Sequence, residues 1–409
     1  MTHHTVQPTS VGRPVSPGQL AWLETEVADW RAAGVVDDAQ AAAIRVRYVA
    51  VRKFSLSKLL LSLGGGFVGI GLIWLVSTNL DDMTSLLRFV VVALVWLGFV
   101  IAAEVLATRR AHRAGDGTTS SSPVVGAFRL VTALAFGAVV FQAAQSIQVP
   151  AYEPSLLGIW GAGALFYAYA TGGVAPLLVS ITAGTGWYVW ELLEDSQDGM
   201  GFVLPVLLAA VIAGAVAAVH AGSRLRNFAP SWREASAVLV LLALFVAAFP
   251  YVDVDGFAWS PQIVLGVAVA VAAVVAAAVL SRGRNRLEVL APLAALIAGV
   301  LLVVWESPEP VSGSVSAEGY AHALVSVAVY VVAAGWYAAL GVMRDSGRLT
   351  FTAMAALVLF TTAQSFAVFA PIVTGAALFL VLGVIFLGSG YLFDRGRRHL
   401  VANLEGASA

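Results

Sequence analysis

Paired carboxylates beside an amide are the residues of this chain best suited to chemistry. Asp81 and Asp82 follow Asn79 directly after the first long apolar stretch. Adjacent carboxylates can hold a divalent cation, or one can act as a general base toward a lipid-linked sugar donor. The same residues also fit an acidic loop that pairs with Arg88. The sequence leaves both interpretations open.

Amides and hydroxyls near two helix ends form a second candidate site. Residues 129–146 align without gaps to residues 348–365, which indicates a repeat in parallel orientation or a chance match in an alanine-rich chain. The polar positions involved are Gln142, Gln145, Ser146, Gln364 and Ser365. Such groups form interhelical hydrogen bonds worth roughly 0.6–2 kcal/mol in lipid. We weigh two roles for them, a polar substrate site between the repeated helices and simple helix adhesion.

Few ionisable residues lie inside the apolar stretches. Glu104 falls near the end of one stretch, and Arg129 lies inside the next if that helix begins at residue 123. Because Arg129 aligns with Arg348 in a short loop, we expect the helix to begin near Arg129. Both side chains then reach the same membrane interface and pair there. The alternative is a buried coupling pair.

The residue classes that usually mark an enzyme are missing. The chain has no cysteine, so disulfides, thiolate metal sites and a cysteine nucleophile are excluded. His220, His322 and His399 are isolated and lack metal-ligand spacing. No phosphate-binding glycine loop, nucleophile elbow or HExxH occurs. We predict no catalytic residue, no metal, no cofactor and no nucleic-acid partner.

The composition places the chain in a lipid bilayer. Hydrophobic residues make up 59% of the sequence, charged residues 11%, and the mean hydropathy is +0.87. Soluble domains carry charges at about a quarter of their positions. One aqueous core could not bury so much apolar surface, whereas lipid solvates it. We predict an all-α, polytopic membrane helix bundle.

Twelve segments are long enough to cross a hydrocarbon core of about 30 Å, which takes about 20 apolar residues. They are residues 55–77, 85–107, 125–149, 155–171, 173–192, 201–222, 233–252, 261–280, 287–305, 320–343, 349–370 and 371–393. The fourth and fifth form one apolar run that is broken by Gly172, Gly173 and Pro176. This interruption favours a tight hairpin over a single overlong helix.

Arginines gather in alternate connections between these segments. The basic clusters fall within residues 45–58, 109–113, 224–233, 282–286, 344–348 and 395–398. The other connections are acidic apart from Arg88, and Trp187, Tyr188 and Trp190 beside Glu191 indicate an interfacial aromatic anchor. Short basic loops stay in the cytoplasm, so we predict that both termini are cytoplasmic. Abundant alanine and arginine with little lysine are typical of a high-GC bacterium, and we expect the bacterial cytoplasmic membrane.

Residues 1–54 predict a small cytoplasmic segment with a helical hairpin, followed by a bundle over 55–393 and a cytoplasmic tail over 394–409. Ser16 and Pro17 begin the first helix, and Gly34 ends it. Asp37 and Gln40 resemble a capping box. The apolar face of the second helix comprises Ala41, Ile44, Tyr48 and Val51. The hairpin either packs on the membrane face or binds a protein partner.

Three segments resemble a bacterial family of predicted membrane proteins catalogued as domain of unknown function 2157. They are residues 34–40, the glycine-rich residues 64–81 ending in Thr78-Asn79-Leu80-Asp81, and residues 136–170 with Gln145 and Trp160. Leu80 replaces the tryptophan usual in the family, and residues 146–148 lack its tyrosine. The resemblance spans residues 18–175 and implies a membrane topology without any established activity.

Three classes of function stay open. Twelve spans with short loops favour a carrier or flippase for a small or lipid-like substrate. The scarcity of polar groups inside the bilayer favours a non-catalytic membrane scaffold or envelope-assembly partner. A membrane glycosyltransferase is the third, although such enzymes usually have larger external loops. The substrate is not predictable from the sequence.

Overall fold

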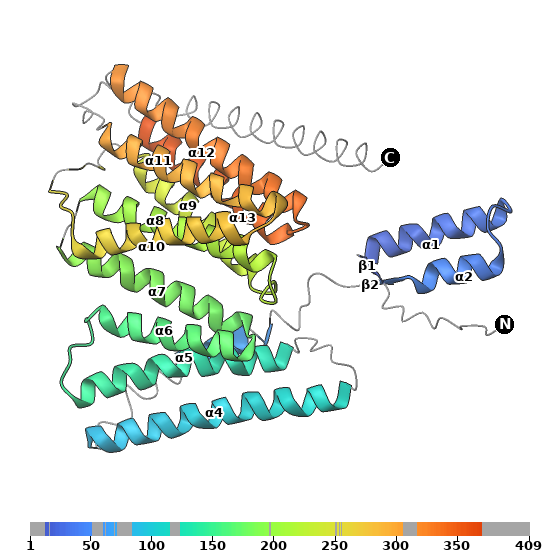
Figure 1. The fold of residues 1–409 in the computed structure, drawn as a ribbon, viewed down its shortest axis with the longest axis horizontal. Coiled ribbons are helices and arrows are strands. Elements are labelled where there is room, and N and C mark those ends of the chain that lie inside the picture. Colours follow the sequence, from blue (N-terminus) through green and yellow to red (C-terminus); the bar gives the residue numbers. More distant parts are fainter. Residues whose placement is uncertain are drawn as a thin grey trace.

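A computed structural model describes most of the 409 residues and consists of a helical bundle and a small N-terminal hairpin (Figure 1). The described residues are 13–15, 17–50, 60–61, 63–68, 70–71, 84–114, 123–195, 198–249, 252, 254, 256–305 and 317–369. Within them the fold is helical apart from one pair of short strands. The all-α prediction is therefore confirmed for the bundle.

The N-terminal hairpin pairs α1 (Pro17–Ala32) with α2 (Asp38–Val46) and stands apart from the bundle in Figure 1. The predicted capping box is present. Asp37 Oδ1 accepts the backbone N–H of Gln40 at 2.7 Å, and Gln40 Oε1 accepts the backbone N–H of Asp37 at 3.0 Å. Gly34 takes a φ of 71° in the connecting turn, as its predicted role as helix terminator requires.

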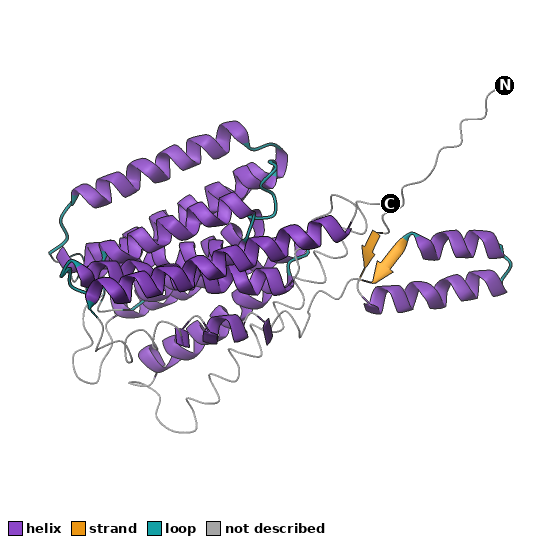
Figure 2. Cartoon of the chain, turned by 90° about the horizontal axis from the view of Figure 1, so that it is seen from below, coloured by secondary structure: helices purple, strands orange, loops and turns teal. Residues whose placement is uncertain are grey.

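Two strands at the base of the hairpin correct the prediction for Tyr48. α2 ends at Val46, and Tyr48 begins β2 (Tyr48–Ala50), which pairs in parallel with β1 (Arg13–Val15) (Figure 2). Tyr48 is β-favouring, and β1 offers it backbone partners that the sequence pattern of one helix does not reveal. Ser16 and Val51 lie outside the described residues.

The bundle follows the predicted segments closely. Its helices are α4 (Ser85–Ala114), α5 (Pro123–Ser146), α6 (Ser155–Thr171), α7 (Val174–Asp195), α8 (Gly199–Ala221), α9 (Ala229–Ala247), α10 (Pro261–Leu280), the short 3-10 helix η1 (Gly283–Val289), α11 (Leu290–Val304), α12 (Ala317–Met343) and α13 (Gly347–Phe369). Residues 60–61, 63–68 and 70–71 of the first predicted span are helical, and the last predicted span, 371–393, lies outside the described residues.

Seven helices of the described residues are long and apolar enough to cross a membrane. They are Ser85–His112, Pro123–Ser146, Gly199–Ala221, Ala229–Ala247, Pro261–Leu280, Asn285–Val304 and Ala317–Met343. The predicted spans at α6, α7 and α13 are helical as well but are not among the seven. α6 has 17 residues, and α7 ends in Glu194 and Asp195. The several apolar helices are confirmed, and the count of twelve stays a prediction.

The predicted interruption at Gly172 and Gly173 separates two helices, α6 and α7, that pack side by side. Gly172 has a φ of 68° and donates its backbone N–H to the carbonyl oxygen of Ala168. The backbone N–H of Gly173 reaches the same oxygen at 3.1 Å. This left-handed C-cap suits glycine, which has no Cβ to clash there.

The bundle divides into two halves joined mainly through α7. In the first half α5 packs against α4, α6 and α7, and in the second half α8 packs against α9, α10 and α11. α7 contacts α8 and α9 across the seam between the halves. α8 is apolar all round and mostly buried, whereas α4 and α10 expose most of their apolar side chains at the periphery.

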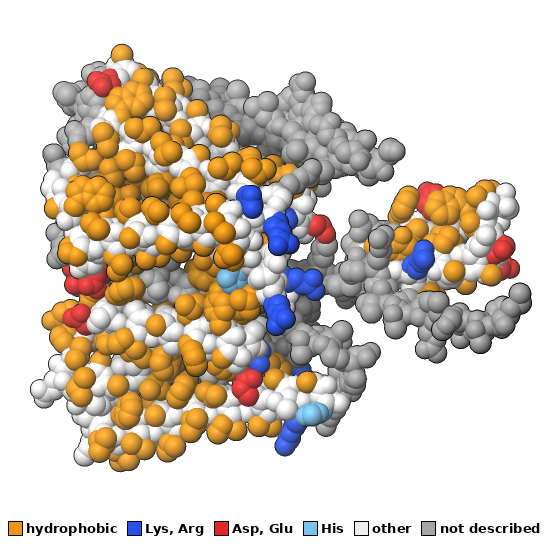
Figure 3. Space-filling model, in the orientation of Figure 1, with side chains coloured by type: hydrophobic (Ala, Val, Ile, Leu, Met, Phe, Trp, Pro, Cys, Tyr) orange, Lys and Arg blue, Asp and Glu red, His pale blue; other side chains and the backbone are white. Residues whose placement is uncertain are grey.

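The two ends of the bundle carry opposite charge. The turns after α8, α10 and α12 meet at one end, where Arg224, Arg226, Arg282, Arg344 and Arg348 lie. Figure 3 shows Lys and Arg side chains, in blue, gathered along the edge of the bundle that faces the hairpin, with a broad apolar belt beside them. Glu153, Glu191, Glu194, Asp198 and Glu318 lie at the opposite end. The alternation of basic and acidic connections along the sequence thus gives the bundle one basic end and one acidic end.

We expect Gly172→Ala to destabilise the protein by about 1–2 kcal/mol, because a Cβ at a positive φ clashes with the backbone. Gly126→Ala is the matched control, since nothing lies within 4 Å of its added Cβ and alanine favours the helix. Unfolding of both variants in detergent measures the difference. Equal stability of the two would contradict the turn assigned to Gly172.

Candidate functional site

The carboxylate pair predicted from the sequence cannot be placed. Asn79, Asp81 and Asp82 all lie outside the described residues. Within the described residues, no group of three or more His, Asp or Glu side chains is positioned to hold a metal ion. The cation-binding hypothesis for this loop therefore stays a prediction.

The repeated amides lie in different halves of the bundle. α5 packs against α4, α6 and α7, whereas α13 packs against α9 and α12, so the structure does not bring the two sets together. Gln145 is exposed while the aligned Gln364 is buried, and its Oε1 has no hydrogen-bond partner. Ser365 is helical, and its side chain is outside what the structure describes.

Gln142 and Ser146 fit the adhesion role. Gln142 is buried on α5. The hydroxyl of Ser146 donates to the carbonyl oxygen of Gln142 at 2.8 Å and lies 3.1 Å from the carbonyl oxygen of Ser85 at the start of α4. The contacts of Ser146 join α5 to itself and to the start of α4, and the role of Gln142 stays a prediction.

A cavity of about 440 Å³ lies at the seam between the two halves. Side chains from α6, α7, α8, α9 and α10 line it, and most of them are apolar. Its polar groups are few, and they come mainly from α7 and α10: Ser180, Thr185, Tyr188, Glu191 and Gln262, with Trp232 from α9. Its volume falls within the roughly 300–1,000 Å³ typical of small-molecule sites.

Two polar atoms in this cavity lack partners. The Tyr188 hydroxyl and Gln262 Oε1 are shielded from solvent and accept or donate no hydrogen bond within the described part of the chain. Leaving a buried polar group unpaired costs about 1–3 kcal/mol, so most such groups are paired. Tyr188 is half-buried, unlike its exposed neighbours Trp187 and Trp190. Trp187 lines the cavity as well, and the interfacial anchor stays a prediction.

The seam is closed at the arginine-rich end by a hydrogen-bonded trio from three helices. The Tyr169 hydroxyl on α6 lies 2.8 Å from His220 Nε2 on α8, and Trp232 Nε1 on α9 donates to that hydroxyl at 3.2 Å. His220 Nδ1 lies 2.8 Å from the carbonyl oxygen of Val216, which can only accept, so Nδ1 carries a proton. Trp232 also lines the cavity and connects it to this closure.

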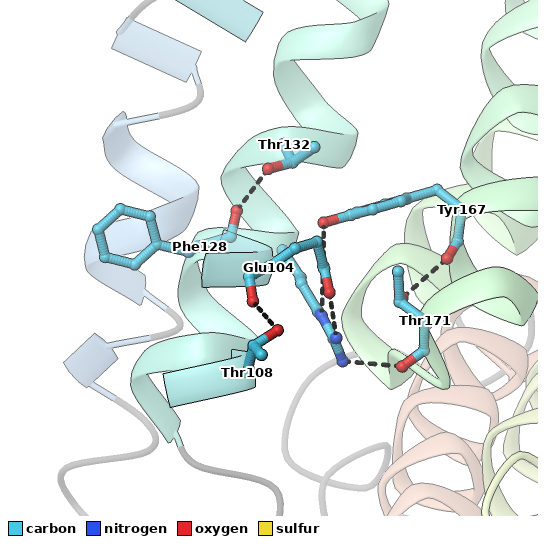
Figure 4. Close-up of polar contacts among 7 residues, drawn as sticks. Glu104, Thr108, Phe128, Thr132, Tyr167 and Thr171 are labelled. Atoms are coloured by element: carbon cyan, nitrogen blue, oxygen red, sulfur yellow. Dashed lines mark hydrogen bonds and ion pairs between the residues drawn. The ribbon is translucent and has the colours of Figure 1, made fainter. Parts of the chain in front are cut away.

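Glu104 and Arg129 pair as predicted, and Figure 4 shows their neighbours. Arg129 donates from Nε and Nη2 to the two carboxylate oxygens of Glu104 at 2.9 and 2.8 Å, and from Nη1 to the carbonyl oxygen of Thr171 at 2.9 Å. Tyr167 donates to Glu104 Oε1 at 2.8 Å. These contacts tie α4, α5 and α6 together.

The start of α5 differs from the prediction. α5 begins at Pro123, so Arg129 lies inside the helix, whereas Arg348 is the second residue of α13. The alignment of residues 129–146 with 348–365 therefore predicted the wrong start for α5, because similar residues occupy different turns of the two helices. Arg129 still reaches the bundle end, since its long side chain extends to the α6–α7 turn, where its Cδ approaches Gly173.

A second ion cluster was missed by sequence reasoning. Glu288 in η1 is buried and accepts from Arg233 Nε of α9 at 2.7 Å and from Arg344 after α12. Arg344 also donates to Asn285 Oδ1 at 2.5 Å. The signal in the sequence was a lone carboxylate in an arginine-rich connection. Gln262 was missed too, although an amide within an otherwise apolar 20-residue helix is unusual.

We expect a thermodynamic coupling of about 1–2 kcal/mol between Arg129 and Glu104, above that of exposed pairs, because two hydrogen bonds form in a partly buried setting. A double-mutant cycle with Arg129→Met and Glu104→Gln measures it through unfolding in detergent. The control cycle uses Arg348 and Glu234, whose ion pair spans 3.1 Å with the arginine side chain 71% exposed. Equal coupling in both cycles would show that the bidentate geometry adds nothing.

One of three comparisons with known proteins finds a match. A search of curated proteins and a search of solved structures find no match. The family model described as "Predicted membrane protein (DUF2157)" matches residues 28–177, which include α2, α4, α5, α6 and the Glu104–Arg129 pair. This confirms the resemblance found in the sequence. The chain is a multi-pass membrane protein with several apolar helices, and its residues 28–177 are similar to that family.

Proposed function

We propose that this protein is a carrier or flippase for a small or lipid-like substrate, which moves along the seam between the two halves of the bundle. The observation that carries the proposal is the seam cavity, with its apolar walls and its few polar groups. Sites between packed bundles of helices are where membrane carriers bind their substrates. A substrate with an apolar body can enter this cavity without losing hydrogen bonds to water.

The groups at the two ends of the cavity support this role. Trp232 and its partners Tyr169 and His220 lie at the arginine-rich end, and Tyr188 and Gln262 lie toward the acidic end. Opening one end while the other stays shut would expose the cavity to one side at a time. Two hydrogen bonds hold the trio at the arginine-rich end, so it can separate at modest cost in free energy.

The orientation belongs to the same proposal. Twelve spans, with both termini on the cytoplasmic side of a bacterial cytoplasmic membrane, would put the arginine-rich end inside. The segments 1–54, 55–393 and 394–409 would then form the cytoplasmic hairpin, the bundle and the cytoplasmic tail. The acidic end would face outward, and the substrate would pass between these two ends.

Single cysteines test the orientation cleanly, because the chain has none of its own. We expect a membrane-impermeant maleimide to label Tyr152→Cys on intact cells, because Tyr152 is exposed in the acidic-end turn between α5 and α6. Arg282→Cys, exposed at the other end, should react only after the membrane is opened. The reverse pattern would overturn the orientation.

A filled cavity tests the transport proposal. We expect Gly184→Leu to reduce transport at least tenfold, because Gly184 lines the cavity and its added Cβ would point into open space. Gly335→Leu on α12 is the matched control, since its Cβ also meets nothing within 4 Å and it does not line this cavity. Proteoliposomes report transport as protein-dependent flipping of fluorescent glucosylceramide, phosphatidylcholine and phosphatidylserine.

Two results would contradict the carrier. One is that none of the probes moves faster than in protein-free vesicles. The other is that the two leucine variants behave alike. Thermal unfolding of both variants serves as the check that each is folded.

A scaffold or assembly partner remains the second candidate, and the N-terminal hairpin favours it. Trp22 and Trp30 are exposed on α1, and such residues often anchor protein interfaces. A glycosyltransferase gains no support from the described residues, because the carboxylates considered for its chemistry, Asp81 and Asp82, lie outside them.

A further inference from the structure

The carboxylate and the amide of the seam cavity lie at one end, and most of the other lining side chains are apolar. Glu191 lies near the end of α7 and Gln262 near the start of α10, so both belong to the acidic end of the bundle. The remaining walls come from residues such as Leu165, Ile212 and Val269. A ligand that fills this space must therefore have a polar head and a hydrocarbon body.

Two unpaired oxygens lie at this end of the cavity. The Tyr188 hydroxyl occupies the space that a Cβ on Gly266 would take, so it rests directly on the backbone of α10. Gln262 precedes Gly266 by one helical turn on the same face of α10, where side chains four residues apart are about 5–6 Å from each other. Both oxygens are shielded and unpaired. They form one polar subsite, which needs a partner from outside the described chain.

The charge of the subsite restricts the chemistry of that partner. Glu191 is the one charged side chain among the residues that line the cavity, and Trp187 Nε1 donates to its Oε2 at 3.2 Å. Gln262 Oε1 can only accept hydrogen bonds, and the described residues that line the cavity include no arginine, lysine or histidine. An anionic head group would be repelled by the Glu191 carboxylate, with no positive charge beside it to offset the repulsion. A head that donates hydrogen bonds would satisfy both unpaired oxygens.

We propose that Tyr188 and Gln262 form the head-group subsite for an amphipathic lipid whose head is uncharged and rich in hydroxyls, with its acyl chain along α6, α8 and α10. This inference rests on the proposed function and names the substrate class for the same cavity. The Tyr188 hydroxyl and Gln262 Oε1 accept hydrogen bonds from the head, and Gly266 keeps the space that Tyr188 occupies.

Two lipids that differ by one phosphate test the subsite. The probes are monooleoylglycerol and 1-oleoyl-lysophosphatidic acid, each titrated into the full-length protein in phosphatidylcholine nanodiscs. Binding is read as the rise in unfolding temperature, since a ligand of the folded state stabilises it in proportion to its occupancy. We expect monooleoylglycerol to bind at least tenfold more tightly. Equal binding of the two probes would overturn the assignment.

Variants of the subsite show whether binding of monooleoylglycerol depends on these residues or is a general effect of lipid on stability. We expect Tyr188→Phe and Gln262→Leu each to weaken binding of monooleoylglycerol about three- to tenfold, the effect of one lost hydrogen bond. Gly266→Ala should weaken it similarly, because its Cβ displaces the Tyr188 hydroxyl. Unchanged binding in all three would remove the proposal.

Stability without ligand gives a second, independent readout. Tyr188→Phe deletes an unpaired hydroxyl and should unfold at the same or a higher temperature. Tyr330→Phe is the matched control, because the Tyr330 hydroxyl donates to the carbonyl oxygen of Ala356 at 3.2 Å and lies outside this cavity. It should unfold at a lower temperature and bind the probe normally. A loss of stability in Tyr188→Phe alone would contradict the unpaired subsite.

The outcomes also separate this inference from the carrier itself. Binding that depends on Tyr188 and Gln262, without flipping of any probe, would keep the site and reject transport. Flipping that Gly184→Leu abolishes and that Tyr188→Phe leaves unchanged, together with unchanged binding, would keep the carrier and reject this subsite.

Discussion

Hydrocarbon around the bundle is the constraint on which the rest of the structure depends. Lipid offers no hydrogen bonds, so every backbone N–H and C=O in contact with it must be paired within its own segment. Helices meet that requirement, and the bundle consists of them. Their outward faces carry valine and leucine, as α4 and α10 show, while the central α8 is apolar on all sides. The buried Glu288, Arg233 and Gln364 accordingly lie in the interior or near helix ends.

At the arginine-rich end, polar groups connect helices. Arg129 joins α4, α5 and α6 through Glu104 and Thr171, and Glu288 joins α9 and the turn after α12 through Arg233 and Arg344. Each of these side chains thus connects elements that lie apart in the sequence. Between the halves, Tyr169 connects α6 to α8 and α9 through His220 and Trp232.

Inside the seam the pairing is incomplete. Among the described residues, the Tyr188 hydroxyl and Gln262 Oε1 are two of few shielded side-chain atoms without a partner, and both line one cavity. An unpaired polar atom lowers stability, so two of them at one place indicate a ligand more strongly than an apolar cavity of the same volume. The unpaired Gln364 Oε1 lies in α13 and is not among the residues that line this cavity.

Sequence alone determined the solvent and the local structure of this protein. Apolar length predicted the helices, and alternating arginines predicted one basic end. The Asp37 capping box and the Gly172 turn followed from local chemistry, because each depends on residues a few positions apart. Tertiary structure decided which helices touch. It separated the repeated amides of α5 and α13, moved Tyr48 into a strand, and placed Tyr188 in the wall of the seam cavity. These features depend on contacts between residues far apart in the chain. Almost every helix is apolar, so the hydrophobic pattern does not indicate which helix faces meet.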